Sequence, residues 1–305
     1  MEQKIRKNYL LSNRDKKLMF FLAKLIGVGE FVLYGSTPVS LIMKGNCMAN
    51  DYDLAIPGKT EENIIKVKRF LKKNGFKIIK SNRKYYIYQK IEVISLYAQK
   101  ERILLDICFM DEISLIGQFN IESLYWRYPE MDCIDKYGTI EALRNKKIVS
   151  IRGLNNENIF LLTSRFIYLC SKYQISLTNK ESQKIVKFIN KKLCKENSYK
   201  TDQYISCLSS ILKSILTAKD RMAFIEELIN SEIVKNFFKE LHSSLINLVK
   251  ENKQFSLLEV KNKGDLINLL EKNMHENNKK EFIKKINMLT KRKWDKQDKT
   301  IKIKK

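Results

Sequence analysis

The sequence predicts an α+β protein in which a head with a mixed sheet is followed by an all-helical region. Strand-like and helix-like runs alternate up to about residue 110, separated by strong breakers such as Pro57-Gly58 and Asn74-Gly75. From about residue 140 almost to the end, apolar residues instead recur at the i, i+3, i+4 spacing of helices. We therefore expect a head domain over residues 1–148, a helical neck and body domain over 149–290 and a basic tail over 291–305.

The head domain alternates helices with strands. We expect helices over residues 14–27, 37–44 and 60–73, and strands over residues 30–34, 51–56, Phe76–Ile79, Lys84–Gln89, Glu92–Leu96 and Arg102–Phe109. Gly35 ends the first strand, and Pro38 falls in the first turn of the next helix, where proline is tolerated. Thr60 is placed to open the third helix. The branched and aromatic residues of the last four runs fit a mixed sheet.

The helical domain is predicted from the same apolar spacing. Helices are expected over Asn158–Tyr173, Asn179–Lys195, Thr201–Thr217, Lys219–Asn230, Ile233–Asn252, Asp265–Asn273 and Lys279–Thr290. Asp265, directly after Gly264, is expected to be the N-cap of its helix.

The composition indicates which partners suit the chain. With 305 residues and a hydrophobic fraction of 44%, the chain is long enough for more than one domain with a buried core. It carries 58 Lys and Arg against 34 Asp and Glu, and this formal charge of +24 indicates a polyanionic partner, most often nucleic acid. The alternative is a generally lysine-rich proteome. The lysines gathered in residues 291–305 favour contact with RNA or phosphate, or a disordered tail.

The cysteines and histidines do not suggest a metal site. None of the six cysteines forms a CxxC pair and several lie in apolar runs, as reduced, buried thiols do. His242 and His275 have no nearby ligand residues, so we expect no zinc. No apolar run is long enough to cross a membrane, and no signal peptide is evident. We therefore expect a cytoplasmic protein without a membrane partner.

Asp51 and Asp53 are the most informative residues for function. In a strand, residues i and i+2 point to the same face, so the two carboxylates should lie side by side. Two anionic oxygen donors on a rigid strand suit Mg²⁺, and a pair of such ions suits phosphoryl or nucleotidyl transfer. The preceding Gly35-Ser36 turn offers N–H groups and a hydroxyl to phosphate oxygens. Together these residues predict a site for Mg²⁺ and a nucleoside triphosphate.

Asp106 is a third candidate acid, with two interpretations. It lies in the apolar run Leu104–Cys108, where a charge is costly unless it is paired or bound to metal. It is either the third metal carboxylate, or the base for the attacking hydroxyl, or a residue on the solvent face of an edge strand. Glu92 is the alternative acid if Asp106 does not serve.

Two cations and two tyrosines are further candidates. Lys44 and Arg165 could contact the nucleotide, or could be general surface or interdomain charges. Tyr34 and Tyr52 are expected to pack in the sheet, with stacking on a base as the alternative.

The head resembles the polymerase-β-like nucleotidyltransferase superfamily. Its signature is a hydrophobic residue, Gly, Gly or Ser, a spacer, and Asp-x-Asp between hydrophobic residues, and Gly35-Ser36 and Asp51-Tyr52-Asp53 match it. More of the chain is similar to one branch, the class II tRNA nucleotidyltransferases (CCA-adding enzymes) and bacterial poly(A) polymerases. The stretches similar to that branch are Lys72–Ile79, Phe119–Tyr125, Ile134–Ile148, Leu161 and Arg165-Phe166. The resemblance covers roughly residues 25–180.

The resemblance implies a fold, a chemistry and a set of partners. The expected fold is a polymerase-β-like nucleotidyltransferase head with a helical neck and body. The expected reaction is two-metal in-line transfer of a nucleotide from ATP or CTP to the 3′ end of a tRNA or another small structured RNA. Asp51, Asp53 and Asp106 would hold two Mg²⁺ ions, and Gly35 and Ser36 would hold the β- and γ-phosphates.

The departures from the family concern base selection. Val39-Ser40 stand where the family usually has Arg-Asp, and Ile116-Gly117-Gln118 replace its Arg-Arg-Asp. The neck motif Glu-Asp-x-x-Arg, whose Asp and Arg hydrogen-bond the incoming base, reads Asn155–Ile159. Asn156 could still donate and accept, but Ile159 cannot. The metal-binding residues are thus kept while the base-selecting set is eroded.

Three hypotheses remain open from the sequence. The first is nucleotide addition to an RNA 3′ end, which the family stretches and the positive charge favour. The second is a nucleotidyltransferase that modifies a protein or a small molecule, as a toxin-like adenylyltransferase does, and the lost base-selecting residues favour it. The third is a catalytically degenerate RNA-binding relative, against which the intact Asp51, Asp53 and Gly35-Ser36 argue.

Overall fold

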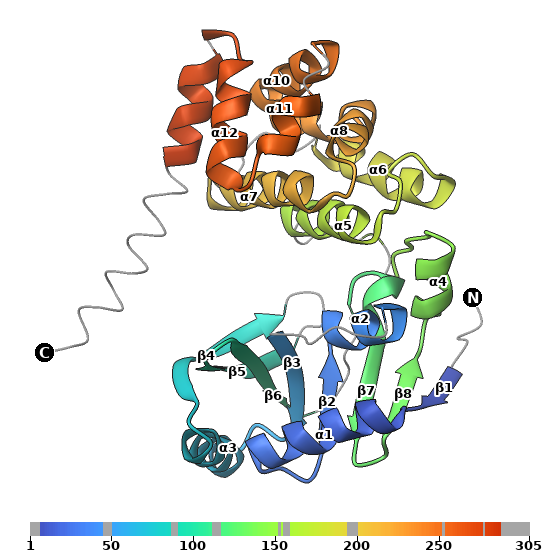
Figure 1. Ribbon diagram of the computed structural model, residues 1–305, viewed down its shortest axis with the longest axis vertical. Coiled ribbons are helices and arrows are strands. Elements are labelled where there is room, and N and C mark those ends of the chain that lie inside the picture. Colours follow the sequence, from blue (N-terminus) through green and yellow to red (C-terminus); the bar gives the residue numbers. More distant parts are fainter. Residues whose placement is uncertain are drawn as a thin grey trace, which may run out of the picture. The chain divides into compact units, whose positions relative to one another are not determined.

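A computed structural model of the chain describes residues 7–44, 51–86, 91–111, 117–151, 154, 159–193, 201–251, 254–276 and 278–287. The chain divides into two compact units (Figure 1). The head unit comprises Met1–Asn145 and Ser150–Gly153, and the helical unit comprises Lys146–Val149 and Leu154–Lys305. The predicted basic tail over 291–305 lies outside the described residues.

The head unit is built on a mixed sheet. Its described strands form an eight-stranded sheet in the order β1-β8-β7-β2-β3-β6-β5-β4. The strands are β1 Lys7–Leu10, β2 Phe31–Tyr34, β3 Asp51–Pro57, β4 Lys77–Tyr86, β5 Ile91–Lys100, β6 Ile103–Met110, β7 Leu124–Tyr128 and β8 Asp132–Asp135. β3 and β6 run parallel, and the other neighbouring strands pair antiparallel. The predicted mixed sheet is therefore confirmed.

Helices of the head unit begin and end at residues that the sequence marks. The helices are α1 Asn13–Ile26, α2 Ser36–Lys44, α3 Glu61–Lys73, α4 Thr139–Arg144 and the short 3₁₀ helix η1 Asn120–Glu122. Thr60 is the N-cap of α3, and its hydroxyl accepts a hydrogen bond from the Asn63 N–H. Asn74, at the other end of α3, donates from Nδ2 to the Leu25 carbonyl at 3.3 Å, which ties α3 to α1. Figure 1 shows α1 and α3 along the same side of the sheet.

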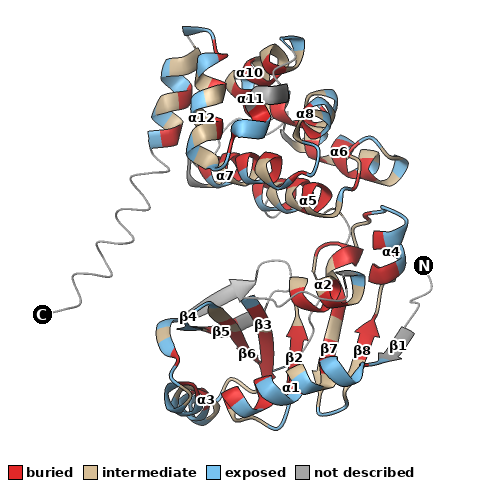
Figure 2. Cartoon of the chain, in the orientation of Figure 1, coloured by how far each residue is buried: buried red, intermediate tan, exposed pale blue. Residues whose placement is uncertain are grey.

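The core of the head unit lies on the central strands. Leu33, Leu54, Ile107 and Phe109 are fully buried, and Figure 2 shows β2, β3 and β6 as largely buried strands. Their burial stabilises the sheet through the hydrophobic effect and places the ends of these three strands at fixed positions. The candidate acids lie on these strands.

The helical unit consists of helices alone among its described residues. They are α5 Ile159–Tyr173, α6 Lys180–Leu193, α7 Thr201–Thr217, α8 Arg221–Asn230, α9 Ile233–Phe237, α10 Lys239–Lys250, α11 Gln254–Glu259, α12 Lys263–Lys272 and a further helix over residues 278–287. α5 and α7 pack closely through buried side chains such as Phe166, Cys170 and Leu208. The predicted α+β fold with a helical body is confirmed.

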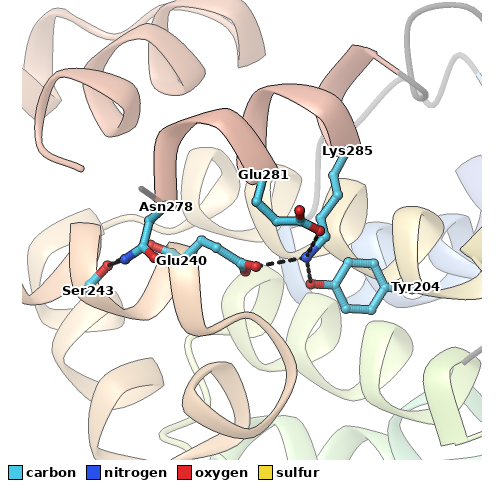
Figure 3. Close-up of polar contacts among 6 residues, drawn as sticks. All are labelled: Tyr204, Glu240, Ser243, Asn278, Glu281 and Lys285. Carbon is cyan, nitrogen blue, oxygen red and sulfur yellow. Dashed lines mark hydrogen bonds and ion pairs between the residues drawn. The ribbon is translucent and has the colours of Figure 1, made fainter. Parts of the chain in front are cut away.

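Polar contacts attach the last described helix to α7 and α10 (Figure 3). The ammonium group of Lys285 lies 3.0 Å from the Tyr204 hydroxyl, 2.8 Å from Glu240 Oε1 and 3.4 Å from Glu281 Oε1. About two turns earlier, Asn278 donates from Nδ2 to the Ser243 hydroxyl at 3.2 Å. These contacts join three helices at one place.

Several sequence predictions of local structure were wrong. β1, β7, β8 and α11 were not predicted, and the two runs Phe76–Ile79 and Lys84–Gln89 belong to a single strand as far as Tyr86, where the described part ends. The helix predicted over Ile233–Asn252 is broken at Phe238, whose extended backbone separates α9 from α10 and whose side chain is buried. Asp265 is not the N-cap of α12: Asn262 is, and Asp265 completes the capping box from the third helical position.

Candidate active site of the head unit

The candidate site is a row of polar side chains across the central strands. In the sheet register, Tyr34 of β2 lies opposite Asp53 of β3, Asp53 beside Asp106 of β6, and Asp106 opposite Tyr97 of β5. Because directly paired residues point to the same face, these four side chains share one face of the sheet. Asp51, two residues before Asp53 on β3, lies on that face as well.

The three acids differ in their exposure. Asp51 is exposed, Asp53 and Asp106 are half-buried, and the Oδ1 atom of Asp106 is buried from solvent. β6 lies between β3 and β5, so the interpretation of Asp106 as a residue on an edge strand was wrong. Asp106 is instead placed beside Asp53, where the sequence interpretation of a third acid requires it.

The turn after β2 approaches the acids closely. Gly35 has a φ of +76°, in the left-handed region that glycine adopts readily, and a Cβ at this position would overlap the carboxylate of Asp53. Ser36 then begins α2, whose first turn contains no acidic residue. The first N–H groups of a helix carry a positive partial charge, and no acidic residue in the first turn of α2 offsets it.

Thr37 fixes this turn to β3 and was not identified from the sequence. Its hydroxyl donates to the Asp51 carbonyl oxygen at 2.8 Å, and the residue is only 2% exposed. The bond joins the first turn of α2 to the start of the strand that carries both aspartates. A Ser or Thr directly after a Gly-Ser turn was the available signal, but its long-range partner cannot be read from spacing.

The opposite end of the same face is apolar. Val32, Ala55, Val93, Cys108 and Met110 form a buried cluster, against which Tyr34 and Tyr125 pack. The Tyr34 hydroxyl reaches the Cys108 sulfur at 3.6 Å, and Tyr52 is 8% exposed, with a pKa raised by burial. Both Tyr34 and Tyr52 therefore pack in the sheet, as expected.

Four other candidate residues either lie apart from the row or have side chains outside the described part. Lys44 is the last residue of α2, and its side chain, like that of Glu92 on β5, lies outside the described part. Asn156 also lies outside the described residues. Arg165 is an exposed residue of α5 in the helical unit.

Two positions at which the sequence departs from the related family are buried in this chain. Val39 is 1% exposed within α2, and Ile159 is 2% exposed at the start of α5. Their side chains pack inside the protein. The side chains of Val39 and Ile159 therefore belong to the core and are not exposed to a ligand.

The described acids do not make a preformed metal cluster. Among the residues that the structure describes, no group of three or more His, Cys, Asp and Glu side chains is arranged to hold a metal ion. The chemistry of Asp51, Asp53 and Asp106 nevertheless suits a hard cation, since all three supply carboxylate oxygens on one face. Gly35 lets the backbone of the preceding turn come close to the Asp53 carboxylate on that face.

The described cysteines are not placed for nucleophilic chemistry. Cys108, Cys133, Cys170 and Cys207 are buried thiols that form no disulfide among the described residues, and burial raises the pKa of the Cys133 and Cys207 thiols to about 12. Such thiols are not nucleophiles at neutral pH. Burial lowers the pKa of His242, which favours its neutral form. No helix of the described residues is long and apolar enough to cross a membrane.

Solved structures of similar fold agree with this arrangement. A CCA-adding enzyme with ATP shares 15% identity at a TM-score of 0.60, and the match covers 91% of this chain and 70% of that one. The Thermotoga maritima CCA-adding enzyme complexed with tRNA shares 13% identity at a TM-score of 0.59 over 93% and 70% of the two chains. A tRNA-processing enzyme shares 12% identity at a TM-score of 0.59 over 92% and 76%.

The likeness concerns the fold. No protein-family model matches the sequence, and no curated protein matches it. The structural match nevertheless extends over both units, because it covers about nine-tenths of the chain. The resemblance seen in the sequence is confirmed at this level: the chain has the nucleotidyltransferase fold of the CCA-adding enzymes and is a divergent structural relative of them.

Proposed function

We propose that the chain is a Mg²⁺-dependent nucleotidyltransferase that adds a nucleotide from ATP or CTP to the 3′ end of a tRNA-like RNA. One observation carries the proposal: the sheet register that sets Asp53 beside Asp106, directly next to the Gly35 turn. Support also comes from the fold, since structures of the same fold are described as CCA-adding enzymes with ATP, with CTP and with tRNA. The charge of +24 suits an RNA acceptor.

In this proposal each part of the row has a separate task. Asp51 and Asp53, with Asp106, would hold Mg²⁺, which when bound supplies charge neutralisation to the phosphates and lowers the pKa of a bound hydroxyl. Gly35 brings the backbone of its turn close to the Asp53 carboxylate, and Gly35 and Ser36 would hold the β- and γ-phosphates through their N–H groups and the Ser36 hydroxyl. In its alternative role, the Asp106 carboxylate would accept the proton of the attacking 3′-hydroxyl instead of binding Mg²⁺.

A second function is favoured by a specific observation. Ile159 is buried and stands where the related family has the neck Arg that hydrogen-bonds the incoming base, so the chain lacks that side chain. An enzyme without that selection could transfer a nucleotide to a protein or a small molecule. The RNA acceptor is preferred because the chain is strongly basic and because its likeness to tRNA-binding structures extends through the helical unit.

A label-transfer assay separates the two functions. The protein is incubated with each labelled nucleoside triphosphate in turn, Mg²⁺ and total RNA, and the label is followed into RNA, protein and small products. The proposal predicts label at RNA 3′ ends, its loss on chelation of Mg²⁺, and its return when Mg²⁺ is restored. Label on protein or on a small product would support the second function, and absence of label with all four nucleotides would contradict both.

A further inference from the structure

The outer side of α1 and α3 exposes three aromatic rings. Phe20 and Phe21 of α1 and Phe70 of α3 are 56%, 46% and 37% exposed. The two helices meet at Gly27, the C-cap of α1, where a Cβ would overlap the Phe70 ring. Because Phe20, Lys24 and Gly27 follow the i, i+4, i+7 spacing of one helix side, the Phe70 ring continues the row that Phe20 begins.

Lysines lie on both sides of these rings. Phe21 and Phe70 each have a lysine four residues before them and another three residues after them, and residues at these spacings share one side of a helix. The pairs, all exposed, are Lys17 and Lys24 around Phe21, and Lys66 and Lys73 around Phe70. Within the described part of the chain, none of these four lysines forms an ion pair. Their charge is therefore available to a partner.

This surface lies on the side of the sheet opposite the candidate acids. The Phe20 ring meets the Tyr128 ring edge-on at 6.0 Å, and Tyr128 stacks at 5.2 Å on Phe31, its partner in the pairing of β2 with β7. The next residue, Val32, belongs to the apolar end of the face that carries the acids, so Phe31 and α1 lie on the other face. α3 lies along the same side as α1 (Figure 1). A ligand bound to these two helices is thus separate from the acids.

We propose that the outer side of α1 and α3 is a docking surface for an acidic segment of another protein. The segment is an amphipathic helix that sets apolar side chains against Phe21 and Phe70 and carboxylates against the flanking lysines. Charge complementarity identifies this occupant. Lys17 and Lys24 are seven residues apart, about 10 Å along α1, so carboxylates two turns apart on a partner helix can face both. Aromatic anchors inside a charged rim are typical of protein–protein interfaces.

The same charges argue against other occupants. A second copy of this surface, or the chain's own basic residues 291–305, would bring cation against cation. An anionic membrane would also meet the exposed Glu61 and Glu62, one turn before Lys66, whereas a protein segment of limited length avoids them. An RNA acceptor has its 3′ end at the acids on the other face of the sheet, and this one step rests on the proposed function.

Binding of defined peptides to the full chain tests the proposal. The probe is a fluorescently labelled, helix-forming peptide of Ala, Leu and Glu, with Glu placed around each Leu as the lysines are placed around each ring. A second peptide has Lys in place of every Glu. Anisotropy, measured without Mg²⁺ or nucleotide, should show that the wild-type protein binds the Glu peptide, less tightly at high salt, and does not bind the Lys peptide.

Charge reversal should exchange the preference between the two peptides. Lys17→Glu/Lys24→Glu should bind the Glu peptide at least about tenfold more weakly than wild type and should gain binding of the Lys peptide. The matched control is Lys180→Glu/Lys187→Glu, two exposed lysines of α6 with the same seven-residue spacing and no aromatic residue between them. The control should stay within about twofold of wild type. Equal losses in the two double variants would show general charge attraction and overturn the proposal.

The rings are tested with the lysines intact. Phe21→Ser and Phe70→Ser should each weaken binding of the Glu peptide at least about fivefold, because an apolar anchor is lost. Leu258→Ser, which removes another exposed apolar side chain from α11, should leave binding unchanged. Circular dichroism checks that each variant is folded, and the lysine variants decide the case if neither phenylalanine variant is. Wild-type affinity in folded Phe21→Ser would overturn the role of the ring.

The remaining outcomes identify a wrong occupant and keep this inference separate from the proposed function. Binding of neither peptide by the wild type would overturn the docking surface. So would a Lys17→Glu/Lys24→Glu variant that binds the Glu peptide normally but loses an unstructured adenosine oligonucleotide or vesicles of phosphatidylcholine and phosphatidylglycerol. Phe21→Ser should transfer label to RNA at the wild-type rate, and a loss of transfer would contradict the separation from the acids. Absence of transfer in the wild type would overturn the proposed function alone.

Discussion

Gly35 is the residue at which the backbone and the carboxylates of the candidate site meet. Its φ of +76° disfavours any L side chain, and a Cβ would collide with the Asp53 carboxylate. Gly138 also has a positive φ, +68°, but nothing lies within 4 Å of a Cβ built there. Both glycines therefore need a positive φ, but of the two only Gly35 lies close to another side chain.

Gly35→Ala should abolish nucleotide transfer, because the new methyl group displaces Asp53 from its place beside Asp106. Gly138→Ala is the matched control: it should cost about 1–2 kcal/mol of stability through backbone strain alone and keep its transfer rate within about threefold. Transfer rates and urea unfolding of both variants provide the measurement. Equal loss of activity in the two variants would show that backbone strain, rather than the contact with Asp53, explains the Gly35 effect.

At the scale of elements, the contacts of Lys285 hold the last described helix to α7 and α10. Burial disfavours the charged ammonium group, but its hydrogen bonds to Glu240 and Tyr204 outweigh this and raise the pKa of Lys285 above its ordinary value. Burial, with the hydrogen bond from Lys285 acting against it, raises the pKa of Tyr204 to about 12. The side chains of Lys285 and Glu240 are 20% and 16% exposed, so solvent screens the pair only in part.

Lys285→Met should destabilise the protein by about 2 kcal/mol at pH 8, because Glu240 loses a charged hydrogen-bond partner in a partly buried position. Both folded-state pKa values lie above the unfolded ones, so this stabilisation is fully present below about pH 10 and is lost as the pH rises toward 12. Urea unfolding between pH 8 and 11 measures it. Lys280→Met, at an exposed lysine of the same helix, should change stability by less than about 0.5 kcal/mol at any of these pH values.

A difference between Lys285→Met and wild type that stays constant up to pH 11 would contradict the role given to the ionised lysine. So would a destabilisation of equal size in Lys280→Met, because that lysine lies outside the contacts drawn in Figure 3.

The elements that sequence periodicity predicted well are those whose signals are local. Helix α3 was predicted with its N-cap Thr60, because the cap, the apolar spacing and the Asn74-Gly75 stop all lie in one short stretch. α9 and α10 were merged, since the break at Phe238 is an apolar residue that keeps the helical spacing and is buried in the core. No local polar signal marks that break.

The strands that were missed depend on long-range pairing. β1 and β8 are four residues each, and β1 is held as an edge strand only by its pairing with β8. β4 was divided in two because Lys80–Lys84 is a polar run, which an edge strand tolerates when it pairs on one side only. The sequence alone does not show that β1 pairs with β8 or that β4 pairs on one side only.

The candidate site could be predicted from the sequence only in part, because part of it depends on long-range strand pairing. The shared face of Asp51 and Asp53 follows from the two-residue period of a strand. The place of Asp106 beside Asp53 depends on the parallel pairing of β3 with β6, fifty residues away in the chain, and stayed open until the register was known. The bond from Thr37 to the Asp51 carbonyl was not predictable at all from spacing.

At the scale of the whole molecule, the two units carry different parts of the proposed activity. The acids and the Gly35 turn belong to the head unit. The helical unit is the part proposed to contact RNA. Structures of the CCA-adding fold match this chain through both units at 12–15% identity. The fold is retained although Val39 and Ile159 have become core residues. We therefore expect the chemistry to be retained and the selection of the nucleotide or of the acceptor to differ from that of the related family.

The central claim is that the acids of β3 and β6 perform nucleotide transfer. Its most direct test is the single-turnover rate of label incorporation by Asp53→Asn, compared with wild type and with Asp111→Asn, whose carboxylate is 68% exposed and pairs with Lys59. The account predicts a loss of about a thousandfold or more for Asp53→Asn, because several kcal/mol of charge stabilisation disappear. It predicts a rate within about twofold of wild type for Asp111→Asn. A folded Asp53→Asn protein that incorporates label at the wild-type rate would contradict the account.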